Sequence, residues 1–221
     1  MRESTLKKLH IGEKTSYNKS YMKNQVILRL NTNPAQIDAL ARLQAAFAEA
    51  CSSLGPVVAE TRCWNRVALH HLTYRKLRES FPALGAQMAC NAIYSVSRSA
   101  RLIFQNPASP WSIDKNPEKA LPTLKFAESA PVYFDRHTFS IRQGQLSMYT
   151  LDGRLKFEGG LSSTDEHRFH QEKLKEIVLS RDSQGFYLVF SFGENSEAPG
   201  DASEMPQYIL ILNTPAPALA A

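Results

Sequence analysis

Six polar side chains recur at helical spacing between residues 85 and 105, and their chemistry suits nucleic acid. Their intervals of four, three, four, three and four residues place them on one face of a helix. They are Gln87, Asn91, Tyr94, Arg98, Arg101 and Gln105. Amide side chains can bind base edges, tyrosine can stack on a base, and arginine can bind phosphate or guanine. The alternative is an ordinary solvated face, although such faces normally mix glutamate with lysine and this one contains no acid.

Two further groups combine basic and aromatic residues. The first surrounds Trp64 and Tyr74 and comprises Arg62, Arg66, Arg75, Lys76 and Arg78. Such a mixture is typical of phosphate contacts with stacking, although the two aromatic residues fit a hydrophobic core better. The second group lies near predicted turns and could line an RNA groove. It comprises Tyr133, Arg136, His137, Arg142, Arg154 and Lys156. Lysine and arginine on edge strands also prevent aggregation, which is the simpler alternative.

The histidines and cysteines give little support for a metal or a catalytic site. His70 and His71 are adjacent and would point about 100° apart on a helix. His167 and His170 have usable spacing beside two acidic residues, but a polar loop explains that cluster more simply. The three cysteines lack close Cys-x-x-Cys spacing, and we expect them to be small buried residues in a reducing compartment. They are Cys51, Cys63 and Cys90. We predict no catalytic residue, no metal and no cofactor, and an enzyme built on the histidines is the least favoured alternative.

The net charge is concentrated at the N-terminus. Residues 1–30 hold seven Lys/Arg and two Glu, a balance that equals the net charge of +5 of the whole chain. A basic arm over residues 1–22 suits a polyanion, because lysine and arginine release counterions from phosphates, although a solvated tail explains it equally well. No apolar run is long enough to cross a bilayer and no signal segment is evident, so we expect a cytoplasmic protein without membrane contact.

Three helices are expected after a first strand. Residues 25–30 are β-branched and aliphatic, and Asn33-Pro34 then favours the start of a helix. Apolar residues at helical spacing predict one helix up to Gly55-Pro56, a second ending at Phe81-Pro82 and a third over about 85–104. The apolar stripe of the third helix should lie in the core. It comprises Ala89, Ile93, Val96, Ala100 and Ile103.

The second half of the chain changes to the alternation of strands. After a connector with five prolines between residues 106 and 131, strands are predicted over 132–141, 145–151, 154–157, 173–180 and 186–192. We therefore expect an α+β fold in which residues 23–33 and 123–193 form a small antiparallel β-barrel, since closure removes exposed edges. Residues 34–122 would be a helical insertion with its connector, and residues 194–221 a linker and a last strand.

This order of elements resembles the N-terminal half of TnpB proteins and of the type V CRISPR effector nucleases. Residues 26–40, VILRLNTNPAQIDAL, are similar to the family's first strand, proline turn and first helix. Residues 64–100 are similar to its paired recognition helices and residues 131–157 to its barrel hairpin. The resemblance implies that the barrel, an oligonucleotide-binding-like wedge domain, binds the structured part of a guide RNA. It also implies that the helical recognition domain contacts the guide–target duplex and the adjacent DNA motif.

The run Tyr208–Leu212 lies where the family's RuvC-like nuclease domain begins, and that domain's first strand ends in a metal-binding aspartate. Here the next residue is Asn213. Two-metal cleavage needs several converging carboxylates, so we expect a nuclease-lacking protein that binds guide RNA and, through it, target DNA. A second protein chain, a RuvC-bearing partner or another copy, is expected to cover this last strand. The alternatives are a stand-alone RNA-guided DNA-binding repressor and a non-catalytic, transposon-derived interaction module.

Overall fold

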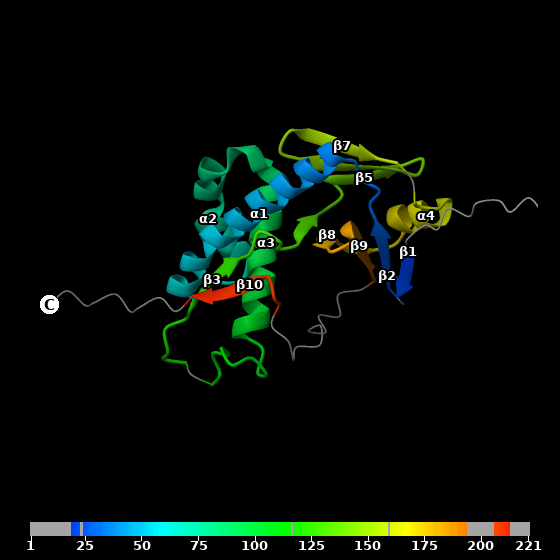
Figure 1. Cartoon of the computed structure of the whole chain (residues 1–221). Coiled ribbons are helices and arrows are strands. Elements are labelled where there is room, and N and C mark those ends of the chain that lie inside the picture. The colour runs from blue at the N-terminus through cyan, green and yellow to red at the C-terminus, as the bar shows by residue number, and fades with distance from the viewer. Residues whose placement is uncertain (1–18, 23, 116, 159, 194–205, 213–221) are drawn as a thin grey trace, which may run out of the picture.

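The computed structural model describes residues 19–22, 24–115, 117–158, 160–193 and 206–212. This part of the chain is a mixed α+β structure with four α-helices, one 3-10 helix and three antiparallel sheets (Figure 1). The helices are α1 (Pro34–Thr61), α2 (Arg66–Ser80), η1 (Pro82–Leu84), α3 (Gly85–Phe104) and α4 (Ser163–Gln171). The strands are β1 (Lys19–Met22), β2 (Gln25–Arg29), β3 (Thr123–Phe126), β4 (Val132–Phe134), β5 (Phe139–Arg142), β6 (Gln145–Thr150), β7 (Gly153–Phe157), β8 (Leu174–Asp182), β9 (Gly185–Phe192) and β10 (Ile209–Leu212).

The largest sheet joins the first two strands of the described chain to strands from its second half. Its strand order is β1-β2-β9-β8-β4, and Ile27 of β2 pairs with Val189 of β9. The strand before the helices therefore lies beside strands that follow them, as the sequence predicts. Helices α1 to α3 are an insertion between β2 and the later strands.

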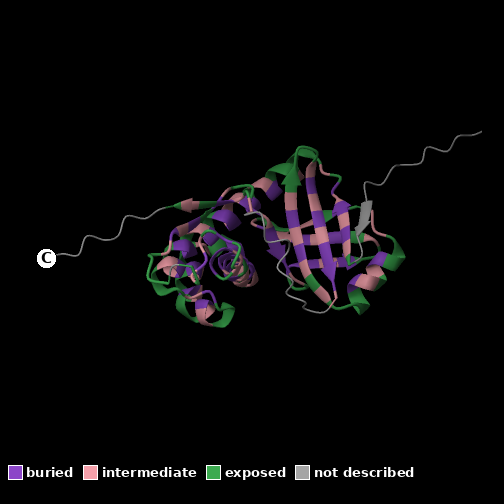
Figure 2. Cartoon of the chain, turned by 90° about the horizontal axis from the view of Figure 1, so that it is seen from below, coloured by how far each residue is buried: buried purple, intermediate pink, exposed green. Residues whose placement is uncertain are grey.

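A second sheet, of order β5-β6-β7, packs its apolar face against the first sheet. Phe139 of β5 lies 5.5 Å from Phe190 of β9, measured between ring centroids. Buried and half-buried residues alternate along β8 and β9, as Figure 2 shows for the large sheet, which is the pattern of a sheet with one covered face.

The predicted closed barrel is not formed, because the strand predicted over residues 132–141 is interrupted. The carboxylate of Asp135 accepts hydrogen bonds of 3.0 Å from the backbone N–H groups of His137 and Thr138. This Asx turn separates β4 from β5 and sends the two strands into different sheets. The result is two sheets packed face to face.

The core of the helical insertion is α3. All five residues of its predicted apolar stripe are at most 1% exposed, so that prediction is confirmed. Trp64, in the short connection before α2, is also in the core, 5.7 Å from Phe104 between ring centroids. Cys51 is buried on α1, as expected, and burial raises the pKa of its thiol. Cys63 and Cys90 are half-buried.

Helix α1 continues through Gly55-Pro56, so the predicted break there is wrong. Proline cannot donate a helical hydrogen bond, yet α1 runs on to Thr61. Gly55 has a packing role within this continuous helix, because the carbonyl of Leu124 in β3 lies where a Cβ at residue 55 would collide with it. Ser52, one turn earlier, accepts a hydrogen bond of 2.9 Å from the N–H of Phe126. Gly55 therefore allows the backbones of α1 and β3 to approach closely, and it does not end the helix.

Strands β3 and β10 form a two-stranded sheet, and β3 packs against α1. This sheet differs from two expectations, that the connector holds no strand and that a second chain covers the last strand. The proline-rich connector contains a strand, and the run around Tyr208–Leu212 is paired within this chain, with Leu210 opposite Lys125. Ile209 is buried, whereas Leu210 and Leu212 are 49% and 45% exposed. The pairing explains why this apolar run needs no second chain to complete its hydrogen bonds on the β3 side.

Three remaining predictions concern the arm, the linker and the polar loop. Strand β1 lies within the predicted arm 1–22, while residues 1–18, 194–205 and 213–221 fall outside the described part of the chain. Residues 163–171 are a helix rather than a loop, with a capping box between Ser162 and Asp165 and with Phe169 buried. Within the described ranges, no helix combines the length and apolar character needed to cross a membrane.

Candidate nucleic-acid interface

The outward face of the β5-β6-β7 sheet carries polar and basic side chains. Strand alternation turns Ile141, Leu146 and Phe157 inward and leaves seven polar side chains outside. We name these seven the basic sheet face: Ser140, Arg142, Gln145, Ser147, Tyr149, Arg154 and Lys156. Three are cations and none is an acid, although Glu158 follows directly after β7.

Register places these side chains in rows across the three strands. Ser140 of β5, Ser147 of β6 and Lys156 of β7 are consecutive partners, and Arg142 faces Gln145 in the next row. Adjacent strands lie about 4.8 Å apart, so one row brings hydroxyls and a cation within reach of one stretch of sugar-phosphate backbone.

Arg154 lies flat across this face. Its guanidinium donates to the hydroxyls of Ser147 and Ser140 at 3.0 and 3.1 Å and to the carbonyls of Ser147 and His137 at 2.9 and 3.2 Å. These neutral acceptors position the guanidinium without neutralising it. Arg154 therefore presents a fixed positive charge to solvent, as a phosphate-binding arginine must.

The turn between β5 and β6 is fixed by α4. Gln143 and Gly144 have φ angles of 52° and 72°, and their N–H groups donate to the carboxylate of Glu166 at 2.9 and 2.8 Å. His170 of the same helix lies 3.2 Å from the carbonyl oxygen of Ile141, at the β5 edge. The histidine cluster of residues 165–170 thus has a structural role beside the basic sheet face. In the described residues, no group of three or more histidine, cysteine and acidic side chains could hold a metal ion.

The predicted polar face of α3 does not form a free surface. The amide of Gln87 donates to the carboxylate of Asp135, and Asn91 is only 5% exposed. Asn91 therefore cannot contact a base edge without a rearrangement of α3. Arg101 is half-buried, and of the six residues only Arg98 and Gln105, which lies just past the helix end, are exposed.

Tyr94 and Arg98 instead connect α3 to the large sheet. Arg98 donates to the hydroxyl of Tyr133 at 3.2 Å and lies 3.6 Å from the carboxylate of Glu176, to which Tyr94 also donates at 3.4 Å. Burial raises the pKa of Tyr94, and Glu176 raises it further, so the phenol stays protonated and acts as a donor. Tyr133 is only 6% exposed, and burial likewise raises its pKa. These groups hold the helical insertion to the sheet.

The basic residues of α2 and of the segments beside it differ in their contacts with the rest of the chain. Arg75 and Lys76 are exposed on the outer side of α2, and Arg75 forms an ion pair of 3.1 Å with Glu79. Arg78 donates to the carbonyl of Pro82 at 3.3 Å, and Arg66 lies over the ring of Tyr94 at 5.2 Å. Most of these cations therefore have an intramolecular contact of their own.

The six candidate RNA-binding residues from the second half of the chain do not all lie on one surface. Arg142, Arg154 and Lys156 converge on the basic sheet face, beside exposed His137. Arg136 lies elsewhere, over the ring of Phe169 at 5.2 Å, and donates to the carbonyl of Glu172 at 3.0 Å. Sequence reasoning missed four members of the face: Ser140, Gln145, Ser147 and Tyr149. The alternation of each strand contained that signal: Ser140 shares the parity of Arg142 on β5, and Gln145, Ser147 and Tyr149 alternate with the buried Leu146 and Met148 on β6.

The comparisons with known proteins identify no relative. Neither a scan against protein-family models nor a search of curated protein sequences finds a match for this chain.

Proposed function

We propose that this chain binds a structured guide RNA and that the basic sheet face is its RNA contact. The observation that carries the proposal is the fixed, unneutralised guanidinium of Arg154 on the same face as Arg142 and Lys156, a face whose strand residues include no acid. The only aromatic ring there, Tyr149, has its hydroxyl bound to the backbone of Ala83. Contacts to phosphate and ribose hydroxyls are therefore better supported than stacking of bases.

The order of the elements supports a TnpB-like or type V-like role. A first strand that joins later strands, with three helices inserted between them, is the arrangement that the sequence resemblance implies. In this proposal the protein lacks nuclease activity of its own, and it supports RNA-guided DNA recognition as a subunit of an effector complex. Guide pairing supplies sequence specificity, and the protein holds backbones.

A second protein chain fits the exposed side of β10. Leu210 and Leu212 are exposed on a short two-stranded sheet, and such a surface favours a protein partner over water. A RuvC-bearing chain is the partner that the resemblance implies. The alternative is a repressor that occupies DNA without a partner chain. Light scattering of the protein alone and with candidate partners distinguishes the two.

The RNA proposal is tested with a triple variant and a matched control. Arg142→Ala/Arg154→Ala/Lys156→Ala should weaken binding to a stem-loop RNA and lower the slope of log affinity against log salt by roughly one unit for each phosphate that the variant no longer binds. Arg75→Ala/Lys76→Ala on α2 removes exposed cations elsewhere and should change the slope less. Fluorescence anisotropy at several salt concentrations measures both, and circular dichroism verifies folding. Equal slopes for wild type and the triple variant would contradict the proposal.

A further inference from the structure

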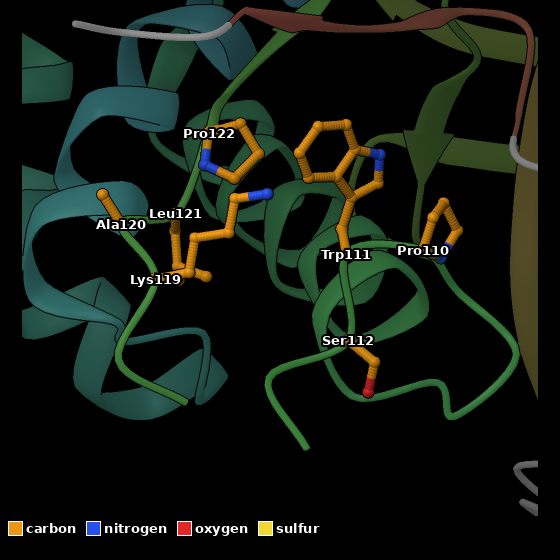
Figure 3. A pocket seen from close by; sticks show the side chains of 7 residues that line it. All are labelled: Pro110, Trp111, Ser112, Lys119, Ala120, Leu121 and Pro122. Atoms are coloured by element: carbon orange, nitrogen blue, oxygen red, sulfur yellow. The ribbon is translucent and has the colours of Figure 1, made fainter. Parts of the chain in front are cut away.

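The hollow beside the proline-rich connector is too small for a ligand larger than water. Figure 3 shows its lining, in which the ammonium of Lys119 lies 5.5 Å from the centroid of the Trp111 indole. The space left between the lining side chains is about that of one water molecule. This hollow therefore holds no further ligand, whereas the outer surface of α2 carries exposed apolar side chains.

Helix α2 exposes these apolar side chains on the side that faces away from the core. Its inner stripe is buried and comprises Leu69, Thr73 and Leu77. On the outer side, Val67 is 64% exposed and Leu72 is 56% exposed. These are the two highest values for a large apolar side chain in the described residues. Exposed apolar residues that stand together, rather than singly, are typical of a contact surface.

Helical spacing brings the two residues into one patch. Val67 and His71 are four residues apart, as are Ala68 and Leu72, so the four side chains adjoin on the helix surface. Rows of residues four apart are the ridges between which the side chains of a facing helix pack. The backbone groups inside α2 are bonded within the helix, so an extended strand has nothing to pair with here. The patch therefore suits a second helix.

The surroundings of this patch are basic. Helix α2 carries four cations, Arg66, Arg75, Lys76 and Arg78, and a single acid, Glu79. Glu79 pairs with Arg75 at 3.1 Å, but both side chains are largely exposed, so the pair contributes little. Arg66 lies over the ring of Tyr94 and Arg78 donates to a backbone carbonyl, and neither contact neutralises a charge. The helix thus presents an apolar centre with a positive rim.

An acidic protein segment fits this surface better than a nucleic acid or a second copy of the chain. The side chains of Val67 and Leu72 gain nothing from contact with phosphates, whereas an apolar centre with a charged rim is the usual anatomy of a protein interface. Two copies of α2 that faced each other across a two-fold axis would bring the same cations together. Aspartate and glutamate would complement them.

We propose that the outer face of α2 binds an acidic amphipathic helix of another protein. The apolar stripe of that helix covers Val67 and Leu72, and its carboxylates lie beside Arg75 and Lys76. From Val67 to Lys76 the rise of α2 is about 14 Å, so a partner helix of about ten residues spans the patch. This inference does not depend on RNA binding, and it concerns a different surface from the exposed side of β10.

Fluorescence anisotropy with a designed peptide tests the proposal in the full chain. The probe is a labelled helical peptide of about 18 residues with a leucine stripe at helical spacing, glutamate on both sides of the stripe and alanine elsewhere. Val67→Gln/Leu72→Gln should weaken its binding about tenfold, because glutamine keeps the helix propensity and removes the apolar contacts. Ile37→Gln removes an exposed apolar side chain from α1 and should leave the affinity unchanged.

The charge of the partner is tested separately. Arg75→Ala/Lys76→Ala should weaken binding of the same peptide and reduce its dependence on salt. A peptide with lysine in place of every glutamate should not bind. Circular dichroism verifies that each variant is folded. The proposal would be overturned by the absence of saturable binding, by equal affinities of the wild type and Val67→Gln/Leu72→Gln, or by equal binding of the two peptides.

The other occupants give results of their own. If Val67→Gln/Leu72→Gln weakens binding of a stem-loop RNA more than binding of the peptide, α2 is an RNA surface and the proposal is wrong. If light scattering shows a dimer of the wild type that this variant does not form, the patch is an interface between copies, and the proposal is wrong as well. Failure of the RNA test at the basic sheet face would leave the peptide result unchanged.

Discussion

Tyr149 of β6 donates a hydrogen bond of 2.7 Å to the backbone carbonyl of Ala83 in η1, and this bond joins the basic sheet face to the helical insertion. Gly85 at the start of α3 makes the approach possible, because a Cβ there would lie 3.0 Å from the tyrosine oxygen. Arg154 is the cross-strand partner of Tyr149. This one hydrogen bond therefore positions both Tyr149 on the basic sheet face and η1, the turn that directly precedes α3.

Tyr149→Phe removes this bond and keeps the ring. We expect a loss of about 1 kcal/mol in the free energy of unfolding, the usual net contribution of one such hydrogen bond, with little change in RNA affinity. Urea denaturation followed by circular dichroism measures the loss. Tyr187→Phe, on the outer face of the other sheet, removes the same atom from a tyrosine that carries no link to the helices. A larger loss in Tyr187→Phe would contradict the role given to Tyr149.

Gly55→Ala should be strongly destabilising, although alanine normally stabilises a helix interior by about 1 kcal/mol relative to glycine. The added Cβ would collide with the carbonyl oxygen of Leu124, which is backbone and cannot turn aside. Displacement of β3 from α1 should cost about 1–3 kcal/mol, the range for overpacked cores. Ser53→Ala on the same helix is the control. If Gly55→Ala instead raises the midpoint of urea denaturation, α1 and β3 are not packed as described.

Asp182 provides a pH-dependent contribution to stability. Its bidentate hydrogen bonds of 2.8 Å from Arg29 lower the pKa of the carboxyl to about 2, from an ordinary value of 3.8. Because the folded-state pKa is lowered, the contribution is complete only above about pH 5, well above the unfolded value, and is lost as the pH falls toward 2. The difference in unfolding free energy between wild type and Asp182→Asn should therefore shrink between pH 5 and pH 2. A difference that stays constant over this range would show that the pair does not couple to folding.

Local patterns predicted the elements more reliably than the contacts between them. The alternation predicted the strands over 145–151 and 154–157 and over 173–180 and 186–192, which form two hairpins, because strand period is a local property. Helix α4 was missed because most of its residues are polar and a single phenylalanine, Phe169, anchors it. The packing of Gly55 against Leu124 of β3 involves residues far apart in the sequence, so it cannot be inferred from the helix alone.

The candidate site residues show the same contrast between local patterns, which the sequence predicts, and long-range contacts, which it does not. Helical spacing placed Asn91, Tyr94 and Arg98 on one face of α3 correctly, but spacing says nothing about what covers a face. The large sheet approaches α3 at that side, with Tyr133 and Glu176 bonded to Arg98 and Tyr94. Alternation, by contrast, was sufficient to place Arg142, Arg154 and Lys156 together, since the other face of their sheet is apolar and its burial fixes their direction.

Two arginine substitutions should separate folding from binding. Arg98→Ala removes the hydrogen bond of 3.2 Å to the Tyr133 hydroxyl and the ion pair of 3.6 Å with the poorly exposed Glu176. We expect a loss of about 1.5–3 kcal/mol in unfolding free energy, the range for a hydrogen bond that involves a charged group. Its affinity for RNA, per folded molecule, should stay near that of the wild type.

Arg154→Ala should behave in the opposite way. Its four acceptors are exposed to solvent and can bind water, so stability should change little, while RNA affinity falls because the fixed cation of the basic sheet face is gone. Arg154→Lys keeps the charge but cannot bridge two strands as a planar fork, so it should restore affinity only in part. Urea denaturation and anisotropy at one ionic strength measure both variants. Weaker RNA binding by Arg98→Ala than by Arg154→Ala, at unchanged stability, would move the interface to α3.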